Sequence, residues 1–385
     1  MNKIERIIKT LNREDVDYLP SQITFADRTR DKEIEEALGL KNDEALDDYL
    51  ENHLDFIFLK YDKPLFLRND LELMRKLASE GIVGLDEENK IVYDIWGMGI
   101  RIGEEGFYYC YSPFRGDKES NKRAKPFLPP SFNLDLLDME PKKAVKEFNP
   151  PEPTAKGNFK ALKEDWALIK DKVFAIPSGY FGIWERANGM LGFRENLMYH
   201  ILDPEIVEEM YEKITEYKIK VAHELIKMGF KVCHHGDDLA YQTSSFFSKE
   251  MYIKMLLPYH KRLFKVYKDA GVKIIYHSCG NITPFIPELI DAGVDVLEPV
   301  QPCMDLKYLK DKFGKDLIFM GGIDTQSILP LGTPNEVKKH VKEVISILGR
   351  DGGYIIAPSQ EIMKDVPIKN IIALIEAIKE ERKID

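Results

Sequence analysis

Short apolar runs alternate with longer amphipathic stretches over the C-terminal two thirds of the chain, and this order constrains the fold more than any other feature. The runs are rich in β-branched and aromatic residues, as buried parallel strands are. They lie at 173–176, 230–233, 272–276, 294–297, 317–320 and 354–357. Stretches with the apolar spacing of helices follow at 204–227, 249–270, 334–348 and 367–381. Repeated strand–helix order predicts a parallel sheet or barrel.

Two further strands are expected upstream, at 18–25 and 54–59, each followed by helix-like sequence. They bring the number of strand–helix units to eight. We therefore predict an α/β fold, a (β/α)8 TIM barrel, that spans residues 1–385 as a single domain.

One region, about residues 85–155, interrupts the alternation after the second strand–helix unit. Within it, 91–97 and 101–103 predict an inserted hairpin, and the proline-rich stretch 126–153 predicts loops over a surface. We expect this insertion to cover the mouth of the barrel, either as a lid or as a structural cover.

Charge, cysteine content and hydropathy exclude several classes of protein. The formal net charge of −10 argues against nucleic-acid binding, which normally requires a basic patch. No apolar run is long enough for a membrane span, and the N-terminal residues lack a signal-peptide pattern. Only four cysteines are spread over 385 residues, so a secreted disulfide scaffold is excluded and a cytoplasmic location is expected.

Polar residues gather where the predicted strands end, which is where the active sites of such barrels lie. The segments share an enrichment in His, Cys, Asp, Glu and Gln. They are Ser178–Tyr180, His234–Asp238, His277–Asn281, Glu298–Cys303, Gly321–Asp324 and Pro358–Glu361. The active site is therefore predicted at this end, centred on His277 and Cys279.

The pair His277-x-Cys279 is the sharpest local feature of the sequence. Side chains two apart on a strand point the same way, so both reach one centre. Imidazole and thiolate together suit zinc, and a catalytic zinc needs about three protein ligands. Glu298, Cys303 or Glu361 would supply the third. The alternative is a buried histidine beside an inert core cysteine.

Further site candidates follow from position at the strand ends. His235 and Asp238 are candidates for proton transfer, and Asp237 for a substrate contact or a metal ligand. The alternative is that one histidine packs behind the strand while the aspartates cap a helix. Asp324 is predicted to contact substrate or to cap the next helix. The remaining substrate-binding candidates are Tyr180, which lies in an aromatic run, Asn281 and Gln301.

At these motifs the sequence resembles the uroporphyrinogen decarboxylase superfamily, whose members are (β/α)8 barrels. The resemblance covers roughly residues 170–382 well and the N-terminal part loosely. The segments that carry it are Trp184–Ala187, Asp203–Glu205, His277–Asn281, Gly293–Gln301, Gly321–Asp324 and Asp365–Ile371.

The departures from the family pattern favour one branch over another. True uroporphyrinogen decarboxylases carry an arginine-rich N-terminal segment for a substrate with many carboxylates, and residues 18–28 lack it. The zinc-dependent, corrinoid-linked methyltransferases instead bind zinc through His-x-Cys and a distant cysteine near the last strand. His277 and Cys279 match this pattern, but residues 357–361 contain no cysteine.

The resemblance thus implies a methyltransferase that moves a methyl group between a small donor or acceptor and a corrinoid protein. It implies zinc as Lewis acid on His277 and Cys279, with Glu298 as third ligand, and His235 or Asp238 as proton-transfer group. A cobalamin-type cofactor on a partner protein would carry the methyl group. The alternatives are metal-free decarboxylation, which predicts an arginine-rich pocket from Arg28 and Arg186, and a non-catalytic corrinoid- or tetrapyrrole-binding barrel.

Overall fold

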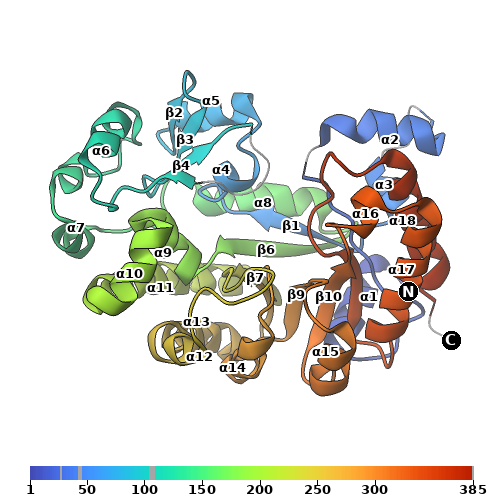
Figure 1. The fold of residues 1–385 in the computed structure, drawn as a ribbon. Helices are drawn as coiled ribbons and strands as arrows, with labels where there is room; N and C mark the ends of the chain where they lie inside the picture. The colour runs from blue at the N-terminus through green and yellow to red at the C-terminus, as the bar shows by residue number, and fades with distance from the viewer. Residues whose placement is uncertain (27, 42–45, 104–108, 384–385) are drawn as a thin grey trace.

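The computed structural model describes residues 1–26, 28–41, 46–103 and 109–383. Its centre is a curled, seven-stranded parallel sheet in the order β1-β6-β7-β8-β9-β10-β11 (Figure 1). The strands are β1 (Leu54–Phe58), β6 (Phe174–Phe181), β7 (Val232–Gly236), β8 (Lys273–His277), β9 (Val296–Val300), β10 (Ile318–Ile323) and β11 (Tyr354–Pro358). The predicted β/α barrel with an insertion is confirmed.

The segment predicted as the first strand closes the sheet without forming a regular strand. It makes isolated bridges, from Ser21 to Ile356 of β11 and from Phe25 to Ile362. On its other side the Asn52 amide bonds both the N–H and the carbonyl of Ile23, each at 2.8 Å. A side chain therefore replaces ladder bonds that a strand would make, so the expectation of a regular strand at 18–25 is wrong.

Helices surround the sheet and follow the strands in sequence (Figure 1). Before β6 and outside the insertion they are α1 (Lys3–Asn12), η1 (Arg28–Arg30), α2 (Asp31–Leu38), α3 (Leu46–Leu50), α4 (Lys63–Phe66), α5 (Leu71–Ser79) and α8 (Asn158–Ile169). Between β6 and β8 they are α9 (Ile183–Leu191), α10 (Phe193–Leu202), α11 (Pro204–Lys227), α12 (Lys249–Met251), the π-helical η4 (Tyr252–Leu256) and α13 (Leu257–Asp269). The last are η5 (Thr283–Phe285), α14 (Ile286–Ala292), α15 (Leu306–Phe313), α16 (Ile328–Leu331), α17 (Pro334–Leu348) and α18 (Ile368–Glu381).

The insertion between α5 and α8 forms an antiparallel sheet of its own, beside short helices. Its elements are β2 (Gly84–Asp86), β3 (Ile91–Tyr93), β4 (Gly99–Arg101), β5 (Tyr109–Tyr111), α6 (Lys118–Ala124), η2 (Lys125–Phe127), η3 (Leu134–Asp138) and α7 (Pro141–Glu147). The predicted hairpin corresponds to the β3–β4 pair. The insertion is joined to α9 by a buried ion pair between Asp94 and Arg186.

The interior of the barrel is filled by inward-facing side chains and closed by α1 at the end where the strands begin. Ile7 and Leu11 of α1 belong to the same buried cluster as Leu54, Val296 and other first residues of the strands. At the opposite end the same inward face becomes polar. The described helices include none that is both long and apolar enough to cross a membrane.

Candidate active site

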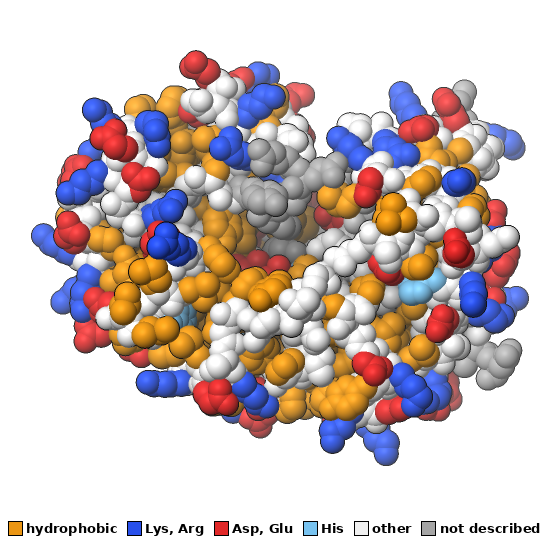
Figure 2. Space-filling model, in the orientation of Figure 1, with side chains coloured by type: hydrophobic (Ala, Val, Ile, Leu, Met, Phe, Trp, Pro, Cys, Tyr) orange, Lys and Arg blue, Asp and Glu red, His pale blue; other side chains and the backbone are white. Residues whose placement is uncertain are grey.

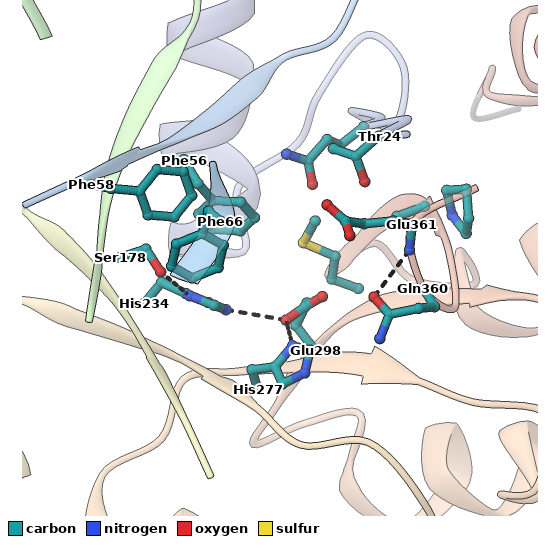
Figure 3. Close-up of a pocket in the computed structure, with 14 residues that line it drawn as sticks. Thr24, Phe56, Phe58, Phe66, Ser178, His234, His277, Glu298, Gln360 and Glu361 are labelled. Atoms are coloured by element: carbon teal, nitrogen blue, oxygen red, sulfur yellow. Dashed lines mark hydrogen bonds and ion pairs between the residues drawn. The ribbon is translucent and has the colours of Figure 1, made fainter. Parts of the chain in front are cut away.

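Four polar side chains lie on the inward face of neighbouring strands at the carboxyl end of the barrel. Ser178 of β6 is in register with His234 of β7, and His277 of β8 with Glu298 of β9. All four line one cavity (Figure 3). β6, β7, β8 and β9 each extend one to five residues beyond the predicted apolar run, so these polar residues belong to the strands themselves.

These side chains form one hydrogen-bonded chain. Glu298 Oε2 lies 2.6 Å from His277 Nδ1 and 3.2 Å from His234 Nε2 (Figure 3). An ionised carboxylate only accepts, so both ring nitrogens donate to it. In neutral His234 the other nitrogen, Nδ1, then accepts from Ser178 Oγ at 2.8 Å. Glu298 thereby fixes the orientation of both imidazoles.

Charge pairing holds His277 and Glu298 in their ionised forms. Burial alone lowers the pKa of His277, but the charge of Glu298, with hydrogen bonds to Cys279 and Glu298, raises it well above its usual value. Burial would raise the pKa of Glu298, yet the two histidines hold it well below the usual range. Burial lowers the pKa of His234, which therefore stays neutral.

The other nitrogen of His277 faces a second group of ligand atoms. Nε2 lies 3.7 Å from Cys279 Sγ and 3.6 Å from Asp238 Oδ1. Donor atoms of Asp238, His277 and Cys279 all lie within 4.8 Å of one another. Burial and the charge of Asp238 raise the pKa of the Cys279 thiol to about 11.

Glu298, predicted as the third ligand, lies on Nδ1 of His277, the nitrogen opposite Cys279, and forms a separate candidate ligand group with His234 and His277. One imidazole cannot turn both nitrogens toward a single ion, so Cys279 and Glu298 cannot ligate the same metal with His277 in this geometry. Glu298 instead has the position of an outer-shell carboxylate, which orients a ligating imidazole through its second N–H. Cys303 and Glu361, the other candidates, belong to none of the candidate ligand groups among the described residues.

The loop that carries Cys279 is held closely. Gly280 has a φ of +82°, and a Cβ there would come within 2.5 Å of the Ala240 backbone. Gln301 accepts from Gly280 N at 2.8 Å and donates to Ser359 O at 3.1 Å. This side chain, predicted to bind substrate, thus ties the loops after β8 and β11 together. Next to the second loop, Gln360 Nε2 lies 3.3 Å from Cys279 Sγ.

His235, predicted as a catalytic residue, points away from the cavity. It follows His234 on β7, and successive strand residues face opposite sides. Its ring packs against Phe264 of α13, with centroids 5.2 Å apart. It lies near Asp237 and His260 in a fully buried group. This placement corresponds to the alternative in which one histidine packs behind the strand.

Asp237 has a structural position as well. Its carboxylate accepts from the N–H groups of Ile183 and Glu185 at the start of α9, and from His260 Nε2 at 2.7 Å. Gly182 makes this approach possible, because a Cβ there would lie 2.3 Å from the Asp237 carboxylate oxygen. Asp237 therefore caps a helix, although α9 precedes it in the chain.

Two of the remaining substrate-binding candidates, Asp324 and Asn281, are not among the described residues that line the cavity. Asp324 accepts from the N–H groups of Gln326 and Ser327, as a cap does. Asn281 donates to Cys303 O at 3.3 Å and accepts from Thr283 N. Tyr180 lies in β6, and its side chain is outside the part of the structure that is described.

Sequence reasoning missed the aromatic wall of the cavity. Phe56 and Phe58 of β1 and Phe66 of α4 line one side, and the Phe58 and Phe66 rings stack with centroids 4.0 Å apart. The cavity volume is about 90 Å³. About 10–15 Å³ suffices for one water, so the cavity holds a group of about six heavy atoms. Period-two spacing of Phe56 and Phe58 on β1 was the available signal.

Comparison with known proteins places these features in context. The sequence profile described as uroporphyrinogen decarboxylase (URO-D) matches residues 130–381, more than half of the chain. The methylcobamide:CoM methyltransferase MtbA of Methanosarcina acetivorans is 26% identical over 318 residues, which cover 80% of this chain and 85% of that protein. A methylated-thiol–coenzyme M methyltransferase of Methanosarcina mazei is 26% identical over 178 residues, so the alignment spans only 46% of either protein. A solved structure described as a methyltransferase from Methanosarcina mazei has a TM-score of 0.61, with 18% identity and 99% of both chains covered.

Proposed function

The chain belongs to the uroporphyrinogen decarboxylase family, and on that premise we propose that it is a methyltransferase that moves a methyl group between a small molecule and a corrinoid protein. One observation carries the proposal: Nε2 of His277, Sγ of Cys279 and Oδ1 of Asp238 converge at the carboxyl end of the barrel. Similarity to methylcobamide:CoM methyltransferases over most of the chain supports the same reaction class.

The donor set suits zinc. Nitrogen, sulfur and carboxylate oxygen are its usual ligands, and three protein ligands leave an open position for substrate. Zinc held by His277, Cys279 and Asp238 would act as a Lewis acid, which stabilises a substrate thiol as thiolate or polarises the atom that bears the methyl group. Glu298 orients His277 from the opposite nitrogen, and Ser178 and His234 hold Glu298.

Metal-free decarboxylation of a substrate with many carboxylates is a weaker reading, because no arginine is among the described residues that line the cavity. Of the two predicted candidates, Arg186 is buried against Asp94. Arg28 is half exposed and pairs with Asp31 and Asp47. Neither guanidinium lines the cavity.

The test combines elemental analysis with a methyl-transfer assay. The protein is purified without a metal-binding tag, zinc is offered under reducing conditions, and the same is done for the His277→Ala, Cys279→Ala double variant. We expect the wild-type protein to bind about one zinc per chain and to methylate or demethylate a corrinoid protein, a reaction measured by the change in corrinoid absorbance. We expect the double variant to lose both the zinc and the reaction. A wild-type protein that binds no zinc would overturn the metal role. A zinc-loaded protein that transfers no methyl group in either direction would overturn the reaction.

A further inference from the structure

The cavity combines aromatic rings with carboxylates, and this pairing points to the charge of the molecule that it binds. Figure 3 shows Phe56, Phe58 and Phe66 on one side, Glu361 on another, and Glu298 between them. Met320 of β10 adds a polarisable apolar surface. No lysine or arginine is among the lining residues that the structure describes.

A neutral or anionic ligand does not account for this arrangement. The charge of Glu298 is paired with the protonated His277, and Glu361 adds a further carboxylate to the described lining. This excess of carboxylates would repel an anion, and a neutral apolar ligand needs no carboxylates. The positive charge of Arg68 partly offsets the rise that burial causes in the pKa of Glu361. The Arg68 guanidinium donates to the carbonyl of Leu65 at 2.8 Å, and Arg68 is not among the described residues that line the cavity. Acidic side chains are also visible at the floor of the hollow beside the insertion (Figure 2).

A methylated onium ion fits the same features. Its charge is spread over methyl groups that cannot donate strong hydrogen bonds, so aromatic faces and nearby carboxylates bind it better than water does. A trimethylammonium or dimethylsulfonium head group is also small enough for a cavity of about 90 Å³. Glu298 Oε2 accepts from both His234 and His277, which holds this carboxylate in place beside the aromatic rings.

We infer that this cavity binds a small quaternary ammonium or sulfonium ion, and that a methyl group of this ion is the one transferred to the corrinoid protein. The inference rests on the proposed methyl transfer but not on the metal. The carbon–nitrogen or carbon–sulfur bond breaks, and its electron pair stays on the heteroatom, which leaves as a neutral amine or thioether. The reduced corrinoid of the partner protein supplies both electrons of the new carbon–cobalt bond.

Direct binding tests the inference without any transfer reaction. Isothermal titration calorimetry of the whole protein would compare tetramethylammonium and trimethylsulfonium with 2,2-dimethylpropan-1-ol, a neutral molecule of similar shape, and with the anionic thiol mercaptoethanesulfonate. We expect the onium ions to bind about tenfold or more tightly than the neutral molecule. The comparison of the two onium ions identifies the preferred heteroatom. Equal binding of the neutral molecule, or displacement of the onium ion by the thiol, would overturn the inference.

Variants separate charge from shape. Phe58→Leu keeps an apolar side chain but removes the ring, and Glu361→Gln keeps the shape but removes the charge. Each is expected to weaken onium binding by roughly 3–10-fold, whereas Glu164→Gln on the exposed face of α8 leaves it unchanged. Phe66→Leu is a second ring variant in case Phe58→Leu does not fold. Unchanged binding in both ring variants would overturn the inference.

A corrinoid methylation assay with the tighter-binding onium ion distinguishes the two proposals. Binding without methylation supports the onium site and contradicts the proposed reaction for this ion. Methylation by another donor, in a protein that binds no onium ion, contradicts this inference alone.

Discussion

Glu298 Oε2 accepts a hydrogen bond from Nδ1 of His277 at 2.6 Å, so only Nε2 of this histidine faces Cys279. This geometry distinguishes a metal ligand from an outer-shell carboxylate, two roles that the sequence alone does not distinguish. A ligand and an outer-shell carboxylate are both acidic residues at the end of a strand. Only the side of the imidazole ring that each one faces distinguishes them.

Zinc content should distinguish the two roles directly. Cys279→Ala removes a proposed ligand and is expected to abolish zinc binding at stoichiometric metal. Glu298→Gln removes the orienting charge but no ligand, so we expect zinc affinity to fall by roughly 10–100-fold, as for other outer-shell changes. Competition with a chelator measures both. Complete loss of zinc in Glu298→Gln, equal to the loss in Cys279→Ala, would restore Glu298 as a ligand.

A new cysteine at position 360 should strengthen the metal site. Gln360 Nε2 lies 3.3 Å from Cys279 Sγ, close enough for a shorter side chain to share an ion with that thiol. Gln360→Cys is therefore expected to tighten zinc binding by roughly tenfold or more, because the new thiolate is a fourth ligand that completes the tetrahedron. Gln326→Cys, at an exposed position, is the matched control. Equal affinities for the two variants would argue that the ion does not lie beside Cys279.

The adjacent histidines of β7 offer a pair of variants on one strand. His234 faces the cavity and bonds Glu298, whereas His235 faces α13. We expect His234→Gln to lower kcat/KM for methyl transfer by roughly 10–100-fold, through loss of support for Glu298. His235→Gln should leave kcat/KM nearly unchanged and alter mainly the thermal unfolding midpoint. A large activity loss confined to His235→Gln would contradict this assignment.

Stability should fall as the pH is lowered from about 6.5 to 4, in part because of His53. Arg6 Nη1 lies 3.1 Å from Nε2 of this buried ring, and burial and the charge of Arg6 lower the pKa of His53 to about 4. In the unfolded chain its pKa is about 6.5. Between these values the unfolded state binds the extra proton, so the free energy of unfolding decreases by about 3 kcal/mol as pH falls. Above pH 6.5 His53 is neutral in both the folded and the unfolded state, and its protonation no longer lowers the free energy of unfolding.

Urea unfolding at several pH values checks this, with His53→Gln as the comparison. In the wild-type protein the free energy of unfolding depends on pH between 4 and 6.5 partly through one proton bound by His53. The variant lacks this group, so its free energy of unfolding should change less steeply with pH, by the contribution of about one proton. Identical slopes for the two proteins would show that the folded ring titrates as the unfolded one does.

Period and length in the sequence were enough to predict most of the barrel. Pro204–Lys227 and Pro334–Leu348 are helices with the predicted bounds. The failures come from interactions between segments that are distant in sequence. The strand expected at 18–25 is replaced by bonds to Asn52 and His53, and no local pattern records those partners.

The predicted polar residues do gather at the strand ends, but the sequence prediction did not take into account which face of its strand each residue occupies. Strand alternation distinguishes His234 from His235, since Val232 and His234 share the inward face. The register of the strands, which brings Glu298 to Nδ1 of His277, depends on the curvature of the whole sheet. It has no signature within either strand.

The helix that closes the floor of the barrel also bears on how the chain reaches its native state. Ile7 and Leu11 of α1 pack with Met320 and Ile355, and the next segment pairs with β11. During synthesis α1 therefore emerges well before β10 and β11, and these contacts form only after both strands have been made. Contacts between the two ends of a chain are slow to form, and until then apolar surface and sheet edges stay open to aggregation. Loss of β11 would thus remove the strand that pairs with the N-terminal segment, and this segment would not dock on the barrel even if its own sequence were intact.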